Sequence, residues 1–192
     1  MTLQAREPQI AQEPKPKLWT REEFYELAEQ GYFRGKRVQL IDGEIFEIAP
    51  QGHPHSRAIT LLNRWATTQF PAPALVRIQM PLNASARSDP EPDVAIVPDP
   101  SWALTDHPET AVLVIEVSDS SLRLDRRKAA IYAAAGVPEY WIVNLVEGQV
   151  EVHRNPQRPE KRYADPSVVK PPQTIAPVAH PQAQLAIGEL FV

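Results

Sequence analysis

Two acidic residues stand where apolar strands would bring them together. Asp93 directly precedes the run Val94–Val97, and Glu116 interrupts the apolar run 112–117. A carboxylate inside such a run is costly to bury. If the two runs form neighbouring strands, both carboxylates and the backbone carbonyl of Val117 make an oxygen-rich pocket suited to Mg²⁺ or Mn²⁺. Such an ion polarises a phosphate and lowers the pKa of a bound water, so the chemistry indicated is phosphodiester hydrolysis.

A lysine falls on the apolar side of the helix expected after the second run. Leu124, Lys128 and Ile131 share helical spacing, so this stripe should face the strands. An ammonium there needs an anionic partner, and the carboxylate of Glu116 is the natural one. Lys128 could orient the attacking water and offset charge on phosphorus. It could also only hold helix and sheet together, or extend into solvent, and the residues alone leave these alternatives open.

The elements that must position these residues form a βαβ unit. The run 112–117 is followed by a helical pattern from Ser121, which Gly136 and Pro138 end, and then by a second apolar run, 140–145. A crossover of this kind joins parallel strands. The predicted fold is therefore α/β, with a central mixed sheet flanked by helices.

An N-terminal helix and a β-hairpin precede this unit. Thr20 and Glu23 have the spacing of a capping box, and Gly31 ends the helix. Asp42-Gly43 is a two-residue turn between alternating segments. A longer amphipathic helix is expected to start near His55 or Ser56. Further strands are expected at 74–79, 94–97 and 150–154, with 163–169 as an added edge.

Composition favours one domain and limits the partners. The chain has 192 residues, 43% hydrophobic and 23% charged, which fits a single domain over residues 18–192 after a flexible arm, residues 1–17. With 20 basic and 24 acidic residues, the net charge of −4 argues against a protein that coats nucleic acid by charge alone. A metal-dependent nuclease remains compatible with it, because an acidic site is screened by the ions it binds.

Some classes are excluded by what the sequence lacks. It contains no cysteine, which removes disulfides, thiolate chemistry and cysteine-based zinc sites, and fits a reducing, cytoplasmic location. The first residues lack the apolar core of a signal peptide, and no apolar stretch has the length of a membrane span.

Four runs carry a resemblance to a known family: EPDVAIV, LVIEVSDSSL, K-x-x-x-Y-A-x-x-G and VPEYWIVN. Pro92-Asp93 followed by Glu116-Val117-Ser118 is similar to the PD-(D/E)XK nuclease signature, and the ordered set resembles the Uma-two family of restriction-endonuclease-like proteins over residues 18–192. The resemblance implies a restriction-endonuclease-like core, a Mg²⁺ or Mn²⁺ site at Asp93 and Glu116, and Lys128 as third catalytic residue. It also implies DNA as substrate, and a homodimer if both strands are cut.

The chain departs from the family pattern at several positions. Ser118 stands where the signature has its lysine, so Lys128 on the following helix would replace it. Gln39 stands where relatives commonly have Glu, and the spacing from Asp125 to Lys128 is one residue shorter than expected. His55 is either a helix cap or surface residue, or a group that contacts phosphate or positions water. The alternative function is a catalytically inactive nuclease-fold module that binds nucleic acid or a protein partner.

Overall fold

The computed structural model describes residues 13–98, 106–164 and 166–192. Most of the predicted N-terminal arm, residues 1–12, lies outside the described residues, and residues 13–20 form neither helix nor strand. In the described part of the chain the helices are α1 (Arg21–Glu29), α2 (His53–Gln69), α3 (Leu122–Ala134) and the 3-10 turn η2 (Ile187–Phe191).

The strands of the described residues form one large sheet and three small ribbons. The large sheet contains β3 (Leu75–Arg77), β4 (Val94–Val97), β5 (Leu113–Ser118), β6 (Glu139–Asn144), β7 (Gln149–Arg154) and β10 (Ser167–Val169). The ribbons pair β1 (Val38–Ile41) with β2 (Glu44–Glu47), β8 (Pro156–Gln157) with β9 (Arg162–Tyr163), and β11 (Thr174–Ile175) with β12 (Leu185–Ala186).

The large sheet is mixed, as the sequence predicts. Its strand order is β10-β7-β6-β5-β4-β3, in which β5 and β6 are parallel and the other neighbours are antiparallel. Helix α3 makes the crossover from β5 to β6, so the βαβ prediction is confirmed. The prediction of one edge strand over 163–169 is wrong. Strand β9 pairs with β8 in a separate ribbon, and only β10 joins the large sheet, beside β7. Pro166 between them lacks the N–H that a continuous ladder needs.

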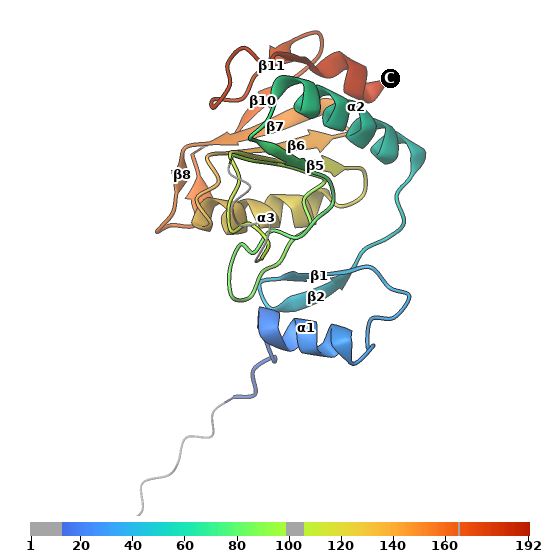
Figure 1. Cartoon of the computed structure of the whole chain (residues 1–192), viewed down its shortest axis with the longest axis vertical. Coiled ribbons are helices and arrows are strands. Elements are labelled where there is room, and N and C mark those ends of the chain that lie inside the picture. Colours follow the sequence, from blue (N-terminus) through green and yellow to red (C-terminus); the bar gives the residue numbers. More distant parts are fainter. Residues whose placement is uncertain (1–12, 99–105, 165) are drawn as a thin grey trace, which may run out of the picture.

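Helices cover both faces of the sheet (Figure 1). On one face, Ile115 and Val117 of β5 pack with Leu62 of α2 in a core that extends to the C-terminal segment. On the other face, Val114 of β5 packs with Tyr132 of α3. This arrangement follows from the strand period of two, which sends successive side chains of β5 to opposite faces.

A lobe built from α1, β1 and β2 lies on the α3 side of the sheet (Figure 1). Thr20 and Glu23 make the predicted capping box of α1. The predicted two-residue turn also forms, with φ of 51° at Asp42 and 79° at Gly43, and a Cβ on Gly43 would lie 2.8 Å from Leu18 Cβ. Arg127 of α3 binds this hairpin through Asp42, at 3.2 Å.

Helix α2 begins earlier than predicted. Its first residue is His53 rather than His55 or Ser56, and Gly52 is the N-cap. Pro54 suggested a boundary in the sequence, but proline is tolerated in the first helical turn because the N–H groups there have no partner inside the helix. Consequently His55 lies within the helix, in its first turn.

Candidate active site

The register of β4 and β5 places Asp93 across from Glu116. These strands are antiparallel with Val94 opposite Ile115, so one further step brings Asp93 opposite Glu116. Directly opposite residues in such a pair lie roughly 4.5–5.5 Å apart and point to the same face. The backbone N–H of Val117 donates to Asp93 Oδ2 at 2.8 Å, which fixes this end of the pair. Both acidic side chains line one cavity.

Asp93 is held by three hydrogen-bond donors. Its side chain accepts from Gln79 Nε2 at 3.0 Å on Oδ1, and from Val117 N and His55 Nε2 on Oδ2, the latter at 3.2 Å. The residue is 7% exposed. Burial raises the pKa of Asp93, but the hydrogen bond and charge of His55 and the other donors outweigh it, so the pKa lies below its ordinary value. Asp93 is therefore ionised at neutral pH.

His55 reaches the site from the first turn of α2. Burial lowers its pKa, but the hydrogen bond and charge of Asp93 outweigh burial, and the backbone of Val117 and the charge of Glu116 add to them, so the pKa is raised. Among the described residues, its Nδ1 has no hydrogen-bond partner. The interpretation of His55 as a cap or surface residue is wrong, since the ring lies against Asp93 inside the cavity.

Glu116 is 3% exposed and bonded to two donors from α3. Its Oε1 accepts from Lys128 Nζ at 3.0 Å and from Tyr132 Oη at 2.7 Å. Burial raises the pKa of Glu116 to about 8, because the effect of Lys128 is offset by the negative charges of Asp125 and Asp93. The pocket thus holds more carboxylate charge than its own cations balance.

Lys128 faces the sheet as the helical spacing predicts. Only 4% exposed, its ammonium lies 3.0 Å from Glu116 Oε1 and 3.2 Å from Asp125 Oδ1. Burial lowers the pKa of Lys128, but the charges of Glu116 and Asp125 outweigh it and raise the pKa. The alternative in which Lys128 extends into solvent is therefore wrong. Asp125 is held in turn by the hydroxyl of Ser121, which donates to its Oδ2 at 2.5 Å.

Two residues of this network were missed by sequence reasoning. Tyr132 is fully buried and lies one helical turn after Lys128, so both reach Glu116 from the same face of α3. The K-x-x-x-Y spacing was a signal that could have identified it. Gln79, which follows β3 and bonds Asp93, had no such signal, because its approach depends on how the chain folds back beside β4.

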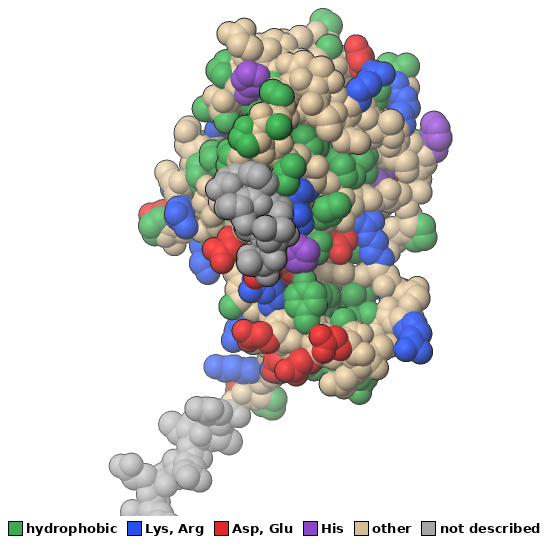
Figure 2. Space-filling view, in the orientation of Figure 1, with side chains coloured by type: hydrophobic (Ala, Val, Ile, Leu, Met, Phe, Trp, Pro, Cys, Tyr) green, Lys and Arg blue, Asp and Glu red, His purple; other side chains and the backbone are tan. Residues whose placement is uncertain are grey.

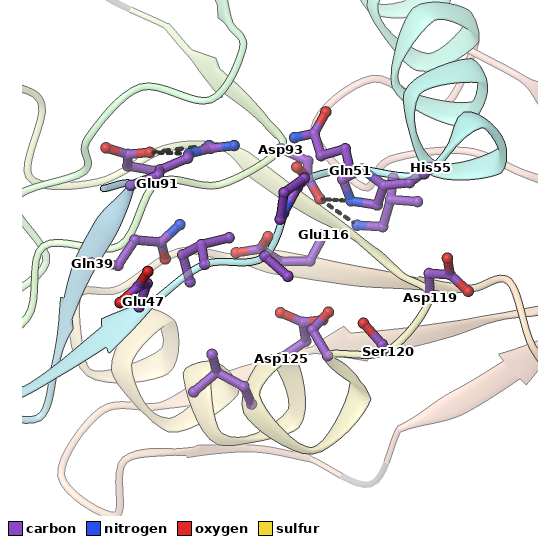
Figure 3. Close-up of a pocket in the computed structure, with 18 of the residues that line it drawn as sticks. Gln39, Glu47, Gln51, His55, Glu91, Asp93, Glu116, Asp119, Ser120 and Asp125 are labelled. Carbon is purple, nitrogen blue, oxygen red and sulfur yellow. Dashed lines mark hydrogen bonds and ion pairs between the residues drawn. The ribbon is translucent and has the colours of Figure 1, made fainter. Parts of the chain in front are cut away.

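The cavity around these groups has a volume of about 330 Å³. In the view of Figure 3, Glu116 lies between Asp93 and Asp125. Gln39 of β1 lines the cavity from the hairpin side, is 4% exposed, and its Oε1 has no hydrogen-bond partner in the described part of the chain. Ser118, at the signature's lysine position, is buried with an unpartnered hydroxyl and does not line the cavity.

Basic residues form two clusters in the sequence, one at 123–128 and one at 154–162, and their members have separate partners. Arg126 pairs with Glu151 and Arg127 with the hairpin, while Lys128 lies inside the site. In the second cluster, Arg154 pairs with the buried Glu139. These partners show that the clusters are not one continuous cationic surface.

The donor set fits a hard cation that keeps several waters. Within the described ranges, no three or more His, Cys, Asp or Glu side chains are grouped so as to hold a metal ion. Two carboxylates and the Val117 carbonyl would leave the remaining positions to water, as Mg²⁺ prefers. Both bonds of Glu116 go to Oε1, so Oε2 has no partner among the described residues. The raised pKa of Glu116 is due first to burial and then to the negative charges of Asp125 and Asp93, which offset the effect of Lys128.

Comparison with solved structures shows that another protein shares this fold. The crystal structure of a protein from Anabaena variabilis ATCC 29413, described as "a putative nuclease belonging to DUF820", is similar with a TM-score of 0.69 and 18% sequence identity, over 90% of this chain and 97% of that chain. This likeness confirms the predicted α/β fold, with a central mixed sheet flanked by helices.

The chain belongs to the Uma2 family. The sequence model of that family, described as "Putative restriction endonuclease", matches residues 21–188. The family resemblance inferred from the motifs is thereby confirmed. A search of curated proteins gave no match. None of the helices in the described ranges has the length and apolar character needed to cross a lipid bilayer.

Proposed function

We propose that this protein is a metal-dependent DNA endonuclease that hydrolyses phosphodiester bonds. Asp93 and Glu116, with the carbonyl of Val117, hold Mg²⁺ or Mn²⁺, and Lys128 orients the attacking water. The observation that carries the proposal is that Asp93 and Glu116 line one cavity, with Asp93 bonded to the backbone N–H of Val117 and the Lys128 ammonium 3.0 Å from Glu116. Family membership and fold support a nuclease, and the pocket supports these roles.

Each side chain has a distinct part in the proposed reaction. A bound divalent ion would polarise the scissile phosphate and lower the pKa of a water. Asp93, fixed by three donors, presents an ionised carboxylate in one orientation. The ammonium of Lys128 holds the water by hydrogen bonding and offsets negative charge that develops on the phosphate oxygens. Tyr132 and His55 are positioning residues, because each bonds a proposed ligand.

Nicking of supercoiled plasmid DNA tests the proposal. Wild-type protein should nick in Mg²⁺ or Mn²⁺ and not in EDTA, while Ca²⁺ should bind and support little cleavage. Glu116→Gln and Lys128→Met should each abolish nicking, and Glu160→Gln, an exposed carboxylate away from the cavity, should retain it. Retained nicking in both site variants would reject the assigned roles. Cutting both strands takes two sites, so we include a homodimer in the proposal, to be tested by sedimentation equilibrium.

A second candidate is a nuclease-fold module that binds nucleic acid or a protein without cutting. Gln39 and Ser118 favour it, because neither supplies the charge that relatives of this kind place there. DNA binding by the wild-type protein, without metal-dependent nicking, would make this candidate the better one.

A further inference from the structure

The groups proposed for catalysis lie at the bottom of a recess. Asp93, Glu116, Asp125 and Lys128 line the same cavity, and each is at most 7% exposed. A phosphodiester must enter that cavity, of about 330 Å³, to reach them. Pockets that enclose a small ligand have volumes of roughly 300–1,000 Å³. The recess therefore has the dimensions of a small-ligand pocket and not of an open groove.

The N-terminal lobe closes one side of this recess and is attached to both of its neighbours. Gln39 of the hairpin lines the cavity (Figure 3). The backbone N–H of Asp89, before β4, donates to the carbonyl of Leu40 at 2.8 Å. From the other side, Arg127 of α3 pairs with Asp42 at 3.2 Å. Because these contacts fix the lobe, a substrate has to fit beside it.

A second cavity, of about 410 Å³, adjoins the first. Both cavities are lined by Arg37, Glu47 and residues 48–51, so they lie next to each other along this part of the chain. Gln79, whose amide donates to Asp93 at 3.0 Å, lines the second cavity. A strand whose phosphodiester lies at Asp93 therefore has space to continue past Arg37.

The charge of the lining changes from the first cavity to the second. In the first, carboxylates outnumber the Lys and Arg side chains, so a phosphate there needs the proposed metal ion. In the second, Lys36 and Arg37 stand against one carboxylate, that of Glu47. The phosphate next to the scissile one is thus attracted to the second cavity.

Both cations are accessible to an anion, although each already has a carboxylate partner. Lys36 Nζ lies 2.7 Å from Glu47 Oε2, and Arg37 Nη2 lies 3.0 Å from Glu91 Oε2. The Lys36 side chain is 53% exposed and that of Arg37 34%. Ion pairs that solvent reaches contribute little, so a phosphate can replace the carboxylate at low cost. Arg37 bonds Glu91 through Nε and Nη2, which leaves Nη1 without a hydrogen bond among the described residues.

The outer surface does not favour a double helix. Binding along a duplex depends on many phosphate contacts from Lys and Arg. On the face drawn in Figure 2, these side chains are scattered, and several acidic side chains gather over the N-terminal lobe. A duplex is also stiff, with a persistence length of about 150 base pairs, so it does not bend one backbone into a recess. A single strand is flexible and follows a narrow charged channel.

We propose that the substrate of this site is an unpaired DNA strand. Its scissile phosphodiester enters the first cavity at Asp93 and Glu116, and the strand continues into the second cavity, where Arg37 and Lys36 bind its phosphates. A continuous duplex fits poorly, because its second strand has no space beside the lobe. This inference rests on the proposed function, which supplies the cleavage chemistry.

Fluorescence anisotropy tests the substrate class, with a labelled single-stranded oligonucleotide and the blunt duplex of the same sequence. Measured in Ca²⁺, the single strand should bind at least about tenfold more tightly than the duplex. In Mg²⁺, a supercoiled plasmid, which contains transiently unpaired segments, should be nicked faster than its relaxed closed form. A duplex that binds as tightly as the single strand, or a single strand that does not bind, overturns the inference.

Variants of the ion pair between Arg37 and Glu91 test the second cavity. Arg37→Gln should weaken single-strand binding and reduce the slope of log K against log salt by about 0.7, the value for one phosphate contact. Glu91→Gln should strengthen binding, because it frees the guanidinium. If the pair were only structural, both variants would weaken binding, and that result removes Arg37 from the site.

Two control variants match these changes outside both cavities. Arg162→Gln removes an exposed arginine and Glu44→Gln removes an exposed carboxylate of the lobe, and neither residue lines a cavity. Both controls should bind the single strand as wild type does. A change in the controls as large as in Arg37→Gln and Glu91→Gln would show an effect of overall charge and would overturn the assignment of Arg37.

The outcomes separate this inference from the proposed function. A preference for the single strand without metal-dependent nicking supports an unpaired strand as the ligand and rejects the nuclease. Metal-dependent nicking, with a duplex bound as tightly as the single strand, keeps the nuclease and overturns the unpaired strand.

Discussion

The two faces of the central sheet use the same strand in opposite ways. Toward α2, β5 presents Ile115 and Val117, which pack with aromatic and aliphatic side chains. Toward α3, the alternate positions include Glu116 and Ser118, and Lys128 of α3 forms an ion pair with Glu116. Both faces are buried, but the β5 side chains toward α2 are all apolar, whereas those toward α3 are Val114, Glu116 and Ser118.

The contrast between the two faces indicates that the α2 face contributes most to stability, whereas the α3 face carries the groups proposed for catalysis. Burial of apolar area on the α2 face is favourable without further conditions. On the α3 face, every ionised group needs a partner, and burial raises the pKa of Glu116 in spite of the nearby ammonium of Lys128. We therefore expect changes on the α2 face to affect folding most, and changes on the α3 face to affect metal and pH responses.

The largest effect on stability is expected from Trp141→Ala. This side chain is fully buried on the α2 face, with its ring centroid 5.8 Å from that of Trp65. Its removal should lower the free energy of unfolding by about 3–5 kcal/mol. Urea denaturation measures the change. A loss no greater than that of Ser118→Ala would break the comparison, since the α2 face would then not be the main source of stability.

Metal binding should stabilise the protein only through carboxylates on the α3 face of the sheet. A divalent ion that binds the folded protein alone raises the free energy of unfolding by about 2.7 kcal/mol at a hundredfold excess over Kd. Calorimetry in Mg²⁺ and in EDTA should therefore give different melting temperatures. Asp93→Asn and Glu116→Gln should each melt at the same temperature in Mg²⁺ as in EDTA. Trp141→Ala should melt at a lower temperature than wild type in both, and should keep the difference between the two conditions. An unchanged melting temperature for the wild type would count against a metal site.

The stability of the metal-free protein should fall as pH rises. Folding raises the pKa of Glu116 from 4.5 to about 8, so the folded state binds more protons across this range and loses that advantage as pH increases. His55, with its raised pKa, acts in the same direction. The lowered pKa of Asp93 acts oppositely, but only in acid. The slope due to Glu116 can reach about 1.4 kcal/mol per pH unit.

Denaturation in EDTA between about pH 5 and about pH 9 tests this slope. Glu116→Gln should remove most of it, because glutamine does not titrate, and the variant should be more stable than wild type at alkaline pH. Exposed Glu147→Gln serves as control and should keep the slope. Stability that rises with pH in the wild type would contradict the assignment.

Ser118→Ala should have the smallest effect. Its hydroxyl is buried without a partner in the described structure, so removal leaves no group unpaired and should raise the free energy of unfolding by at most about 1 kcal/mol. Nicking should persist, since Lys128 supplies the cation. Loss of nicking in Ser118→Ala, with Lys128→Met active, would reverse the two assignments.

Local signals predicted the centre of the fold and the approach of Lys128 to Glu116. The apolar runs gave β4 and β5, and helical spacing aimed Lys128 at the sheet, because both follow from short-range periodicity. The hydrogen bond from His55 to Asp93 could not be predicted in this way. It joins residues on α2 and before β4 that only the folded chain brings together. The uncapped start at Gly52 was also missed, since proline normally suggests a boundary.

The sequence order of the site has a consequence for folding. Asp93, Glu116 and Lys128 belong to one continuous stretch, built from a strand pair and the helix that follows, whereas Gln39 arrives from the N-terminal lobe. Contacts of short sequence separation form at low loop-closure cost and tend to form early. Asp93, Glu116 and Lys128 should therefore come together before the N-terminal lobe packs against them and encloses the cavity. In kinetic terms, φ-values should be higher for apolar residues of β5 than for those of β1.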